Sequence, residues 1–197
     1  MMQNLDNIWQ EYINQDSLSQ QTLNDLIWYI ENNDKPEEAI VMATDMLVEE
    51  PNNKTLKKLI PCLVKQLDHE DDFIRELAVS CVAARMKLYE HAEKVLNMAQ
   101  SDPYGNVRGL AAASLWGVID KVDFVLRKQI AMYLYGSITN IAYDDWHKQC
   151  AYGSILKIME VPIHMWPAKK LNPDIPNMVD KILLKKFKEK YNIEGIT

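Results

Sequence analysis

The chain has 197 residues, of which 48% are hydrophobic and 25% are charged, and its formal net charge is −6. This composition is too apolar for an intrinsically disordered chain, and the apolar residues are too dispersed to supply the roughly 18–20 consecutive residues of a membrane-spanning helix. A dedicated nucleic-acid binder normally carries a basic excess, so the acidic balance argues against that class.

The N-terminal part of the chain is predicted to be helical. Apolar residues in segments 5–13 and 23–30 recur at spacings of three and four, as one face of a helix requires. A third helix is predicted over residues 36–50, because proline suits a first helical turn and the two glutamates that follow favour its positive end. No segment shows sustained alternation with a period of two, so the fold is predicted to be all-α.

Residues 59–86 and 94–119 follow one plan, which indicates an internal repeat. In each, an apolar helix ends in an acidic or Asp-Pro turn, and a second helix opens with an aliphatic-arginine pair and continues with small residues. An offset of 33 residues aligns Arg75 with Arg108. A unit of this kind cannot cover its own apolar face, so it must stack on a neighbour.

These two segments resemble HEAT repeats, in which a proline within the first helix is followed by a turn aspartate, a Val-Arg pair and a run of alanines. The matching residues are Pro61, Asp68, Ile74, Arg75 and Ala78 in one unit, and Asp102, Pro103, Val107, Arg108, Ala111 and Ala112 in the next. The resemblance is best over residues 59–119. It implies a right-handed α-solenoid of stacked antiparallel helical pairs. It also implies that four residues stabilise the contact between repeats: Asp68, Arg75, Asp102 and Arg108.

A third, atypical helical pair is predicted over residues 122–138 and 146–160. Asp144 and Asp145 precede the second of these helices and are well placed to cap it. Four of the eight prolines fall between residues 161 and 176, which indicates an extended loop. The chain is therefore predicted to be one helical-repeat domain with four parts: degenerate N-terminal helices (1–58), a repeat core (59–160), a Pro-rich loop (161–176) and a capping helix (177–191).

The sequence contains no recognisable catalytic or metal-binding motif. Its four histidines form no HExxH and no pair at i, i+4 spacing, and each is predicted to lie on the surface. There is no GxSxG, P-loop or GxGxxG pattern. The three cysteines, Cys62, Cys81 and Cys150, lie in apolar runs and are predicted to be buried, reduced thiols. We therefore expect no catalytic residue, no cofactor and no metal.

Two clusters are candidates for binding a partner. The acidic turn at residues 70–72 could receive a basic partner, although helix capping is the favoured interpretation. Two acids, a tryptophan and a histidine gather at residues 144–147, where a plain helix cap is favoured over acid-base chemistry, and Tyr104 lies in another turn. Tryptophan and tyrosine supply large contact areas if they share one face. The candidates are Glu70, Asp71, Asp72, Tyr104, Asp144, Asp145 and Trp146.

Charge is uneven along the chain and bears on the expected partner. Residues 1–60 carry a net −7, residues 61–120 carry −3, and residues 121–197 carry +4. With the HEAT resemblance, this favours a non-enzymatic protein-binding module that grips a partner on its concave face. The acidic front suggests a basic partner, and a narrower hypothesis is an immunity or antitoxin protein that inhibits a basic toxin domain.

Two alternatives stay open. Some alkylpurine DNA glycosylases resemble HEAT arrays, but the net charge of this chain is wrong for neutralising phosphates. The chain could also be a structural subunit of a larger assembly. Its first residues lack a basic region followed by an apolar core, so we expect no signal peptide, a cytoplasmic location and no membrane partner.

Overall fold

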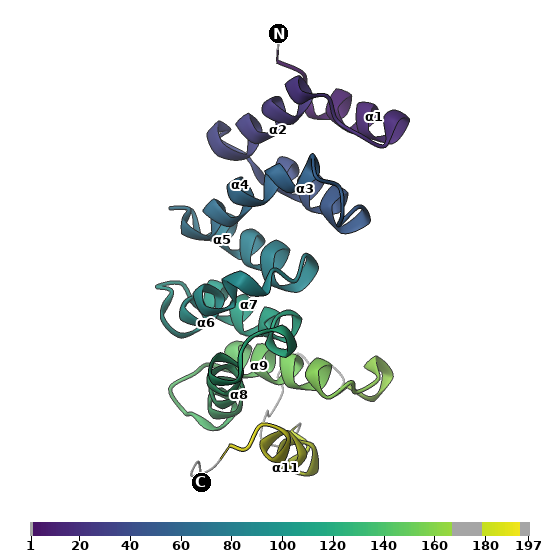
Figure 1. Cartoon of the computed structure of the whole chain (residues 1–197). Coiled ribbons are helices and arrows are strands. Elements are labelled where there is room, and N and C mark those ends of the chain that lie inside the picture. The colour runs from purple at the N-terminus through teal and green to yellow at the C-terminus, as the bar shows by residue number, and fades with distance from the viewer. Residues whose placement is uncertain (1, 167–178, 194–197) are drawn as a thin grey trace. The chain divides into compact units, whose positions relative to one another are not determined.

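A computed structural model describes residues 2–166 and 179–193, and every regular element among them is helical (Figure 1). The all-α prediction is confirmed. The chain divides into two compact units, unit 1 (Met1–Met86) and unit 2 (Lys87–Thr197). The division falls between the two segments that carry the repeat motif.

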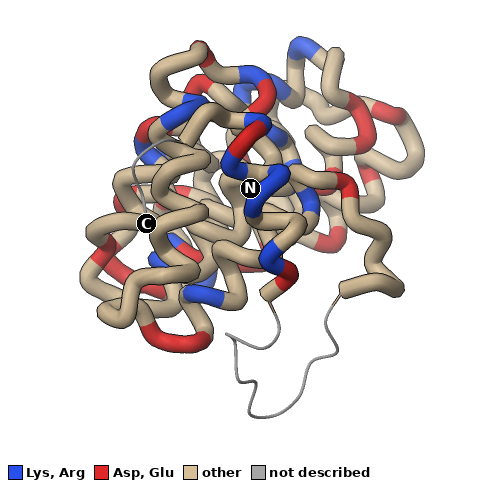
Figure 2. The backbone as a smooth tube through the Cα atoms, turned by 90° about the horizontal axis from the view of Figure 1, so that it is seen from below, with Lys and Arg blue, Asp and Glu red and all other residues tan. Residues whose placement is uncertain are grey.

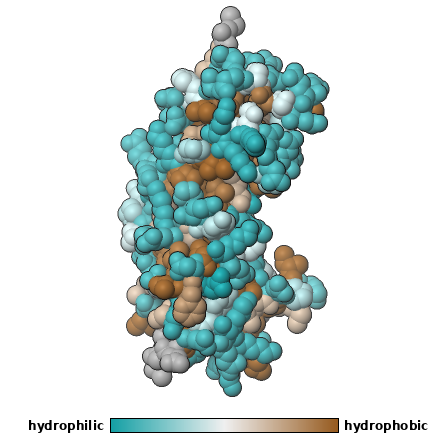
Figure 3. All heavy atoms as spheres, viewed as in Figure 1, coloured by the Kyte–Doolittle hydropathy of each residue, from teal (hydrophilic) through white to brown (hydrophobic). Residues whose placement is uncertain are grey.

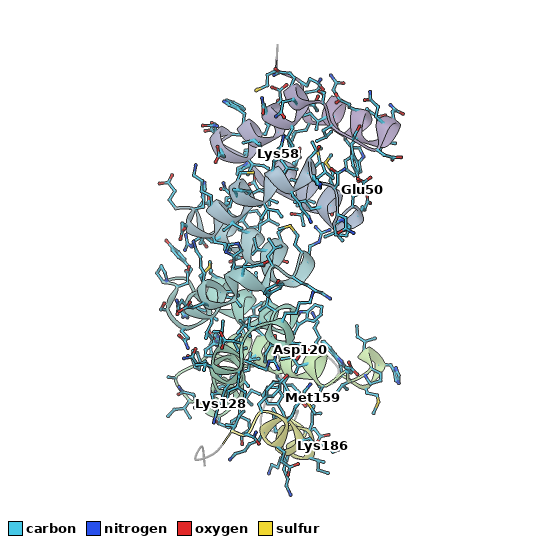
Figure 4. The ribbon with its side chains drawn as sticks, viewed as in Figure 1. Glu50, Lys58, Asp120, Lys128, Met159 and Lys186 are labelled. Carbon is cyan, nitrogen blue, oxygen red and sulfur yellow. The ribbon has the colours of Figure 1, made fainter. Side chains whose placement is uncertain are left out.

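Unit 1 is a layered arrangement of helices around one apolar core. Its elements are α1 (Leu5–Gln15), α2 (Gln20–Asn32), α3 (Glu37–Glu49), η1 (Leu56–Leu59), α4 (Ile60–Lys65), η2 (Gln66–Asp68), α5 (Asp72–Val79) and η3 (Ser80–Arg85). α3 packs against α1, α2 and α5, and α2 packs against α4. Lys58 of η1 (labelled in Figure 4) donates a hydrogen bond to the side-chain oxygen of Gln20 on α2 at 3.0 Å.

Polar side chains cap the first turns of three helices of unit 1. Asn4, Ser19 and Asp71 each accept a hydrogen bond from a backbone N–H in the first turn of α1, α2 and α5. Such caps satisfy N–H groups that have no partner within the helix. The helix predicted over residues 36–50 is α3, and its first turn carries the two glutamates as expected.

α5 continues directly into η3, which is a π-helix. The N–H of Met86 donates to the carbonyl oxygen of Cys81, five residues earlier, at 2.9 Å. A π-turn accommodates an extra residue and rotates the side chains that follow it. Arg85, in this turn, forms an ion pair with Asp45 of α3. The sequence pattern predicted a helix here but not its change of pitch.

Unit 2 holds the remaining described elements. They are η4 (Tyr89–His91), α6 (Ala92–Ser101), α7 (Gly105–Ser114), η5 (Leu115–Gly117), η6 (Ile119–Lys121), α8 (Phe124–Thr139), α9 (Asp145–Ile158), η7 (Ile163–Met165) and α11 (Lys181–Lys190). α7 packs on α6 and α9, and α8 packs on α9 and α11. After α11, the Tyr191 hydroxyl donates to Asp120 (labelled in Figure 4) at 3.4 Å, which ties the chain back to η6.

Several features predicted from the sequence are present among these elements. The predicted cap at Asp144 is confirmed, because its carboxylate accepts from the N–H of His147 at 2.7 Å. The final helix, predicted over 177–191, is present as α11. Most of the predicted loop at 161–176 lies outside the described residues. The three cysteines are buried and free, as expected.

The arginine of the repeat motif has the same geometry in both units. Nη1 of Arg75 donates to the carbonyl oxygens of the residues six and five positions earlier, at 2.8 and 3.0 Å. Nη1 of Arg108 does the same at 2.7 and 3.2 Å. Each arginine therefore closes the turn before its own helix, and this common geometry supports the 33-residue repeat. The contribution of Arg75, Arg108, Asp68 and Asp102 to contacts between repeats stays a prediction.

Candidate protein-binding groove

Unit 1 carries a groove bounded by α1, α3 and α5, with a cavity volume of about 470 Å³. The residues that line it are Asp6, Trp9, Glu37, Glu38, Val41, Met42, Asp45, Phe73 and Leu77. Along α1 and α5 these residues lie three or four positions apart, and on α3 they form two adjacent rows with a spacing of four, so each helix contributes one face to the groove. Figure 3 shows hydrophobic atoms at the surface where α3–α5 lie, with hydrophilic side chains around them.

The floor of the groove is made of large apolar side chains that reach the surface. Val41 is 38% exposed and Phe73 is 56% exposed, whereas Trp9, Met42 and Leu77 are half-buried. The ring of Trp9 packs against Tyr12, with the ring centroids 5.7 Å apart. Apolar residues scattered singly over a surface need no explanation, but a hollow lined by several of them is typical of a binding site.

Carboxylates form the rim of this apolar floor. Among the described residues, Asp6, Glu37 and Glu38 have no hydrogen-bonding or ion-pairing partner for their side chains. Asp45 differs, because it is paired with Arg85. Three negative charges without a hydrogen-bonded or ion-paired partner therefore border the groove, and no basic residue is part of its lining.

A second, more polar pocket of about 670 Å³ adjoins the groove and shares Glu37, Glu38 and Phe73 with it. The rest of its lining is Leu5, Asn33, Asp34 and Lys35. Three carboxylates thus face one ammonium group in this pocket. The exposed ring of Phe73 stands where the apolar groove passes into the acidic pocket.

The predicted acidic turn at residues 70–72 adjoins this groove. Asp71 caps α5 by accepting from the N–H of Phe73 at 2.8 Å, which agrees with the favoured interpretation. The backbone oxygen of Glu70 accepts from Arg75. Asp72 directly precedes Phe73, so the turn stands at the Phe73 end of the groove. Whether the three acids of the turn contact a partner stays a prediction.

Sequence reasoning missed the groove itself. The sequence of α3 contained an indication of it, because α3 buries Ala39, Ile40 and Ala43 but also exposes Val41 and Val48. A helix that is apolar beyond the stripe needed for its own core has apolar surface left for another contact. The exposed ring at Phe73 could not be recognised from periodicity, because its exposure depends on how α5 packs.

The remaining candidates come together in unit 2, at the contact between α7 and α9. Tyr104 is 50% exposed and Trp146 is 47% exposed. A Cβ atom on Gly109 would lie 2.6 Å from Nε1 of Trp146, and one on Gly105 would lie 3.9 Å from Oδ2 of Asp144. The start of α9 therefore lies against α7, immediately after Tyr104. Asp145 follows as an exposed residue in the first turn of α9.

The prediction that His147 lies on the surface is wrong, because the residue is only 2% exposed. Its ring stacks on Tyr143, with centroids 4.1 Å apart and planes at 8°, and its Nε2 lies 2.8 Å from the Tyr133 hydroxyl. That hydroxyl also donates to the backbone oxygen of Ala99 at 2.7 Å. The arrangement joins α6, α8 and α9 through one polar network. Burial lowers the pKa of His147.

Burial also governs the thiols of unit 1. It raises the pKa of Cys62 to about 12 and raises that of Cys81 as well. Because the thiolate is the reactive form, these thiols stay protonated and unreactive near neutral pH. Both cysteines are packing residues in this structure.

The two units differ in net charge, and Figure 2 marks the acidic and basic positions along the backbone. Unit 1 has 16 acidic and 7 basic residues, a net of −9, whereas unit 2 has 12 acidic and 15 basic residues, a net of +3. In unit 2 the ammonium groups of Lys87 and Lys157 lie 4.9 and 4.6 Å from the ring centroid of Trp116, within the range of a cation–π interaction. The acidic character of the chain therefore belongs to unit 1.

In the part of the chain that the structure describes, no three or more His, Cys, Asp or Glu side chains gather closely enough to hold a metal ion. None of the described helices has the length and apolarity needed to cross a membrane. No family model, curated protein or solved structure matches the chain. The resemblance to HEAT repeats stays a prediction.

Proposed function

We propose that the chain is a non-enzymatic protein-binding module and that the groove of unit 1 docks a basic protein. The observation that supports this most directly is a hollow of exposed apolar side chains bordered by three carboxylates without partners. Apolar contact supplies affinity, and the carboxylates select a positive partner and speed its approach. A narrower form of the proposal is an immunity or antitoxin protein that acts in the cytoplasm and neutralises a basic toxin domain.

The three carboxylates also stabilise the helices in which they lie. Asp6, Glu37 and Glu38 lie in the first turns of α1 and α3. An acid there typically stabilises its helix by about 0.3–1 kcal/mol. This role explains why each acid stands at a helix start. It does not account for the exposed Val41 and Phe73 beside them, whereas a docked partner accounts for both.

Unit 2 offers an observation in favour of a different function. Its net charge is +3, and two lysines accompany the ring of Trp116. A basic surface with an aromatic residue suits nucleic acid, as in a HEAT-like DNA-processing enzyme. Binding of the full chain to duplex DNA at low salt, weakened by Lys157→Gln, would favour this alternative. Absence of such binding would count against the DNA-processing alternative and favour a protein partner bound by unit 1.

The proposal can be tested by site-specific crosslinking in the cells that encode the chain. A photoreactive amino acid replaces Val41 in the groove, and in a control it replaces Val125, which is strongly exposed on α8 of unit 2. We expect Val41 alone to yield a crosslinked protein of basic isoelectric point. The purified partner should then associate more slowly as salt is added, and more slowly with Glu38→Gln.

Two results would count against this function. The first is equal crosslinking from Val41 and Val125, which would indicate unspecific capture or a subunit buried in a larger assembly. The second is a captured partner whose association is indifferent to salt and to Glu38→Gln, because the rim carboxylates would then have no part in recognition.

A further inference from the structure

We infer that the groove of unit 1 recognises an amphipathic α-helix with a lysine or arginine at one end of its apolar face. The inference rests on the proposed function and adds the shape of the segment that docks. It is carried by three features of the described residues: the absence of backbone groups with which an extended chain could pair, the three helices that bound the groove, and the acidic pocket at its end.

Backbone hydrogen bonding favours a helical occupant over an extended one. The groove is lined by side chains from α1, α3 and α5, whose own backbone groups bond within those helices. Among the described residues there is no strand edge to which an extended segment could add. An extended chain would leave the N–H and C=O groups that it turns toward this floor without partners, which is unfavourable. A helix pairs these groups internally.

The apolar lining of the groove suits the ridge of a helix. Trp9 comes from α1, Val41 and Met42 from α3, and Leu77 from α5, so three helices contribute apolar side chains to one hollow. Helices pack by placing such ridges into grooves between neighbouring side chains. A partner helix would enter with apolar residues at positions i, i+3, i+4 and i+7. Met42, with its flexible thioether, can adapt to anchors of different shape.

The adjoining pocket specifies a cation beside the apolar anchors. Asp34, Glu37 and Glu38 face it against the single charge of Lys35. Phe73 stands between the two hollows and is more than half exposed. A guanidinium or ammonium group placed there would lie against the ring and pair with the carboxylates. Arginine fits best, because its planar group can do both at once.

The probes for the test are three synthetic peptides of about 14 residues, which is about four helical turns. The first has leucine on one helical face and lysine elsewhere. The second has the same composition in an order that destroys the apolar face, and the third replaces lysine with glutamate. Fluorescence anisotropy of the labelled peptides is measured with the full chain. We expect the ordered Leu/Lys peptide to bind at least about ten-fold more tightly than either of the others.

Two pairs of variants locate the binding. Val41→Glu should weaken binding of the ordered peptide by about ten-fold or more, because it buries a charge under the helix, whereas Val125→Glu adds the same charge in unit 2 and should change nothing. Glu38→Gln should weaken binding by about two- to five-fold and reduce its salt dependence. Glu90→Gln removes the same charge from an exposed position in unit 2 and should have little effect. Circular dichroism checks that each variant is folded, and Phe73→Ala replaces Val41→Glu if that variant is not.

The possible failures are distinct. Equal binding of the two Leu/Lys peptides would overturn recognition of a helix while leaving a basic partner in place. Binding that Val41→Glu and Phe73→Ala leave unchanged would overturn the groove as the site. If neither basic peptide binds, or if the Leu/Glu peptide binds best, the proposed function itself is overturned.

Discussion

At the residue scale, His147 shows how a polar group is held inside unit 2. The Tyr133 hydroxyl donates to the backbone oxygen of Ala99 and so accepts from Nε2 of the imidazole, which places the proton of the neutral ring on Nε2. Nδ1 is buried and has no hydrogen-bonding partner among the described residues. Protonating Nδ1 would place a charge in an interior site, so the neutral ring is the form that the fold accommodates.

This arrangement gives the stability of the chain a pH dependence. The pKa of His147 lies below the ordinary value of 6.5, chiefly because of burial, with the Arg108 charge acting in the same direction and Asp144 opposing them. As the pH falls, His147 is therefore protonated at a higher pH in the unfolded chain than in the folded chain. The stability that the neutral ring contributes above about pH 6.5 is lost as the pH falls toward the pKa of His147 in the folded chain. Urea unfolding at pH 7.5 and 5.0 should show a smaller difference for His147→Phe than for the unchanged chain. Parallel pH profiles would contradict the assignment.

Two helical glycines give a matched test of close packing. A Cβ on Gly109 would stand 2.6 Å from Nε1 of Trp146, whereas one on Gly153 would have nothing within 4 Å. Gly153→Ala should raise the free energy of unfolding by about 0.5–1 kcal/mol, because alanine favours a helix. Gly109→Ala should lower it by about 1 kcal/mol net, since Trp146 must be displaced. Urea unfolding measures both variants. An equal rise in the free energy of unfolding for both would mean that the packing of Trp146 does not require glycine at position 109.

At the element scale, the turn before α5 is closed by an arginine and not only by its cap. Arg75→Met removes two charge-assisted hydrogen bonds to backbone oxygens from a buried position, and should cost about 2–3 kcal/mol of unfolding free energy. Arg85→Met removes a surface ion pair with Asp45 and should cost less than about 1 kcal/mol. Chemical unfolding of both variants gives the comparison. Similar losses would show that the turn tolerates water in place of the guanidinium.

The elements themselves were the most predictable part of the molecule. Spacings of three and four residues indicate a helix because they recur over many positions, and caps such as Asp144 add a local signal. The π-turn at η3 had no such signal, because its pitch depends on how Ser80–Arg85 pack against α3. The groove was missed for a related reason. Residues far apart in sequence, such as Trp9 and Phe73, share its lining only after three helices have packed.

The same limit applies to the buried histidine. Nothing in the residues next to His147 distinguishes it from a surface histidine, because its partners Tyr133 and Ala99 lie on α8 and α6. Its burial follows from the contact of α9 with α8. Sequence periodicity within a single helix carries no information about that contact.

At the scale of the whole molecule, the formal charge of −6 is the balance of two parts with opposite signs. This bears directly on the choice between functions. The net charge of unit 1 favours the approach of a basic protein and opposes that of a nucleic acid, whereas the net charge of unit 2 has the reverse effect. A salt titration of partner binding reports on the first of these, and DNA binding at low salt reports on the second.

The division at Met86 also means that the isoelectric point near 5.3 describes neither part of the chain. Fragments 1–86 and 87–197, with net charges of −9 and +3, should migrate toward opposite electrodes at neutral pH and be retained on opposite ion-exchange resins. This holds whether or not the fragments fold, because formal charge is a property of sequence. The intact chain should follow its acidic part and bind an anion exchanger. Retention of both fragments on the same resin would show that local shifts in ionisation outweigh the difference in composition.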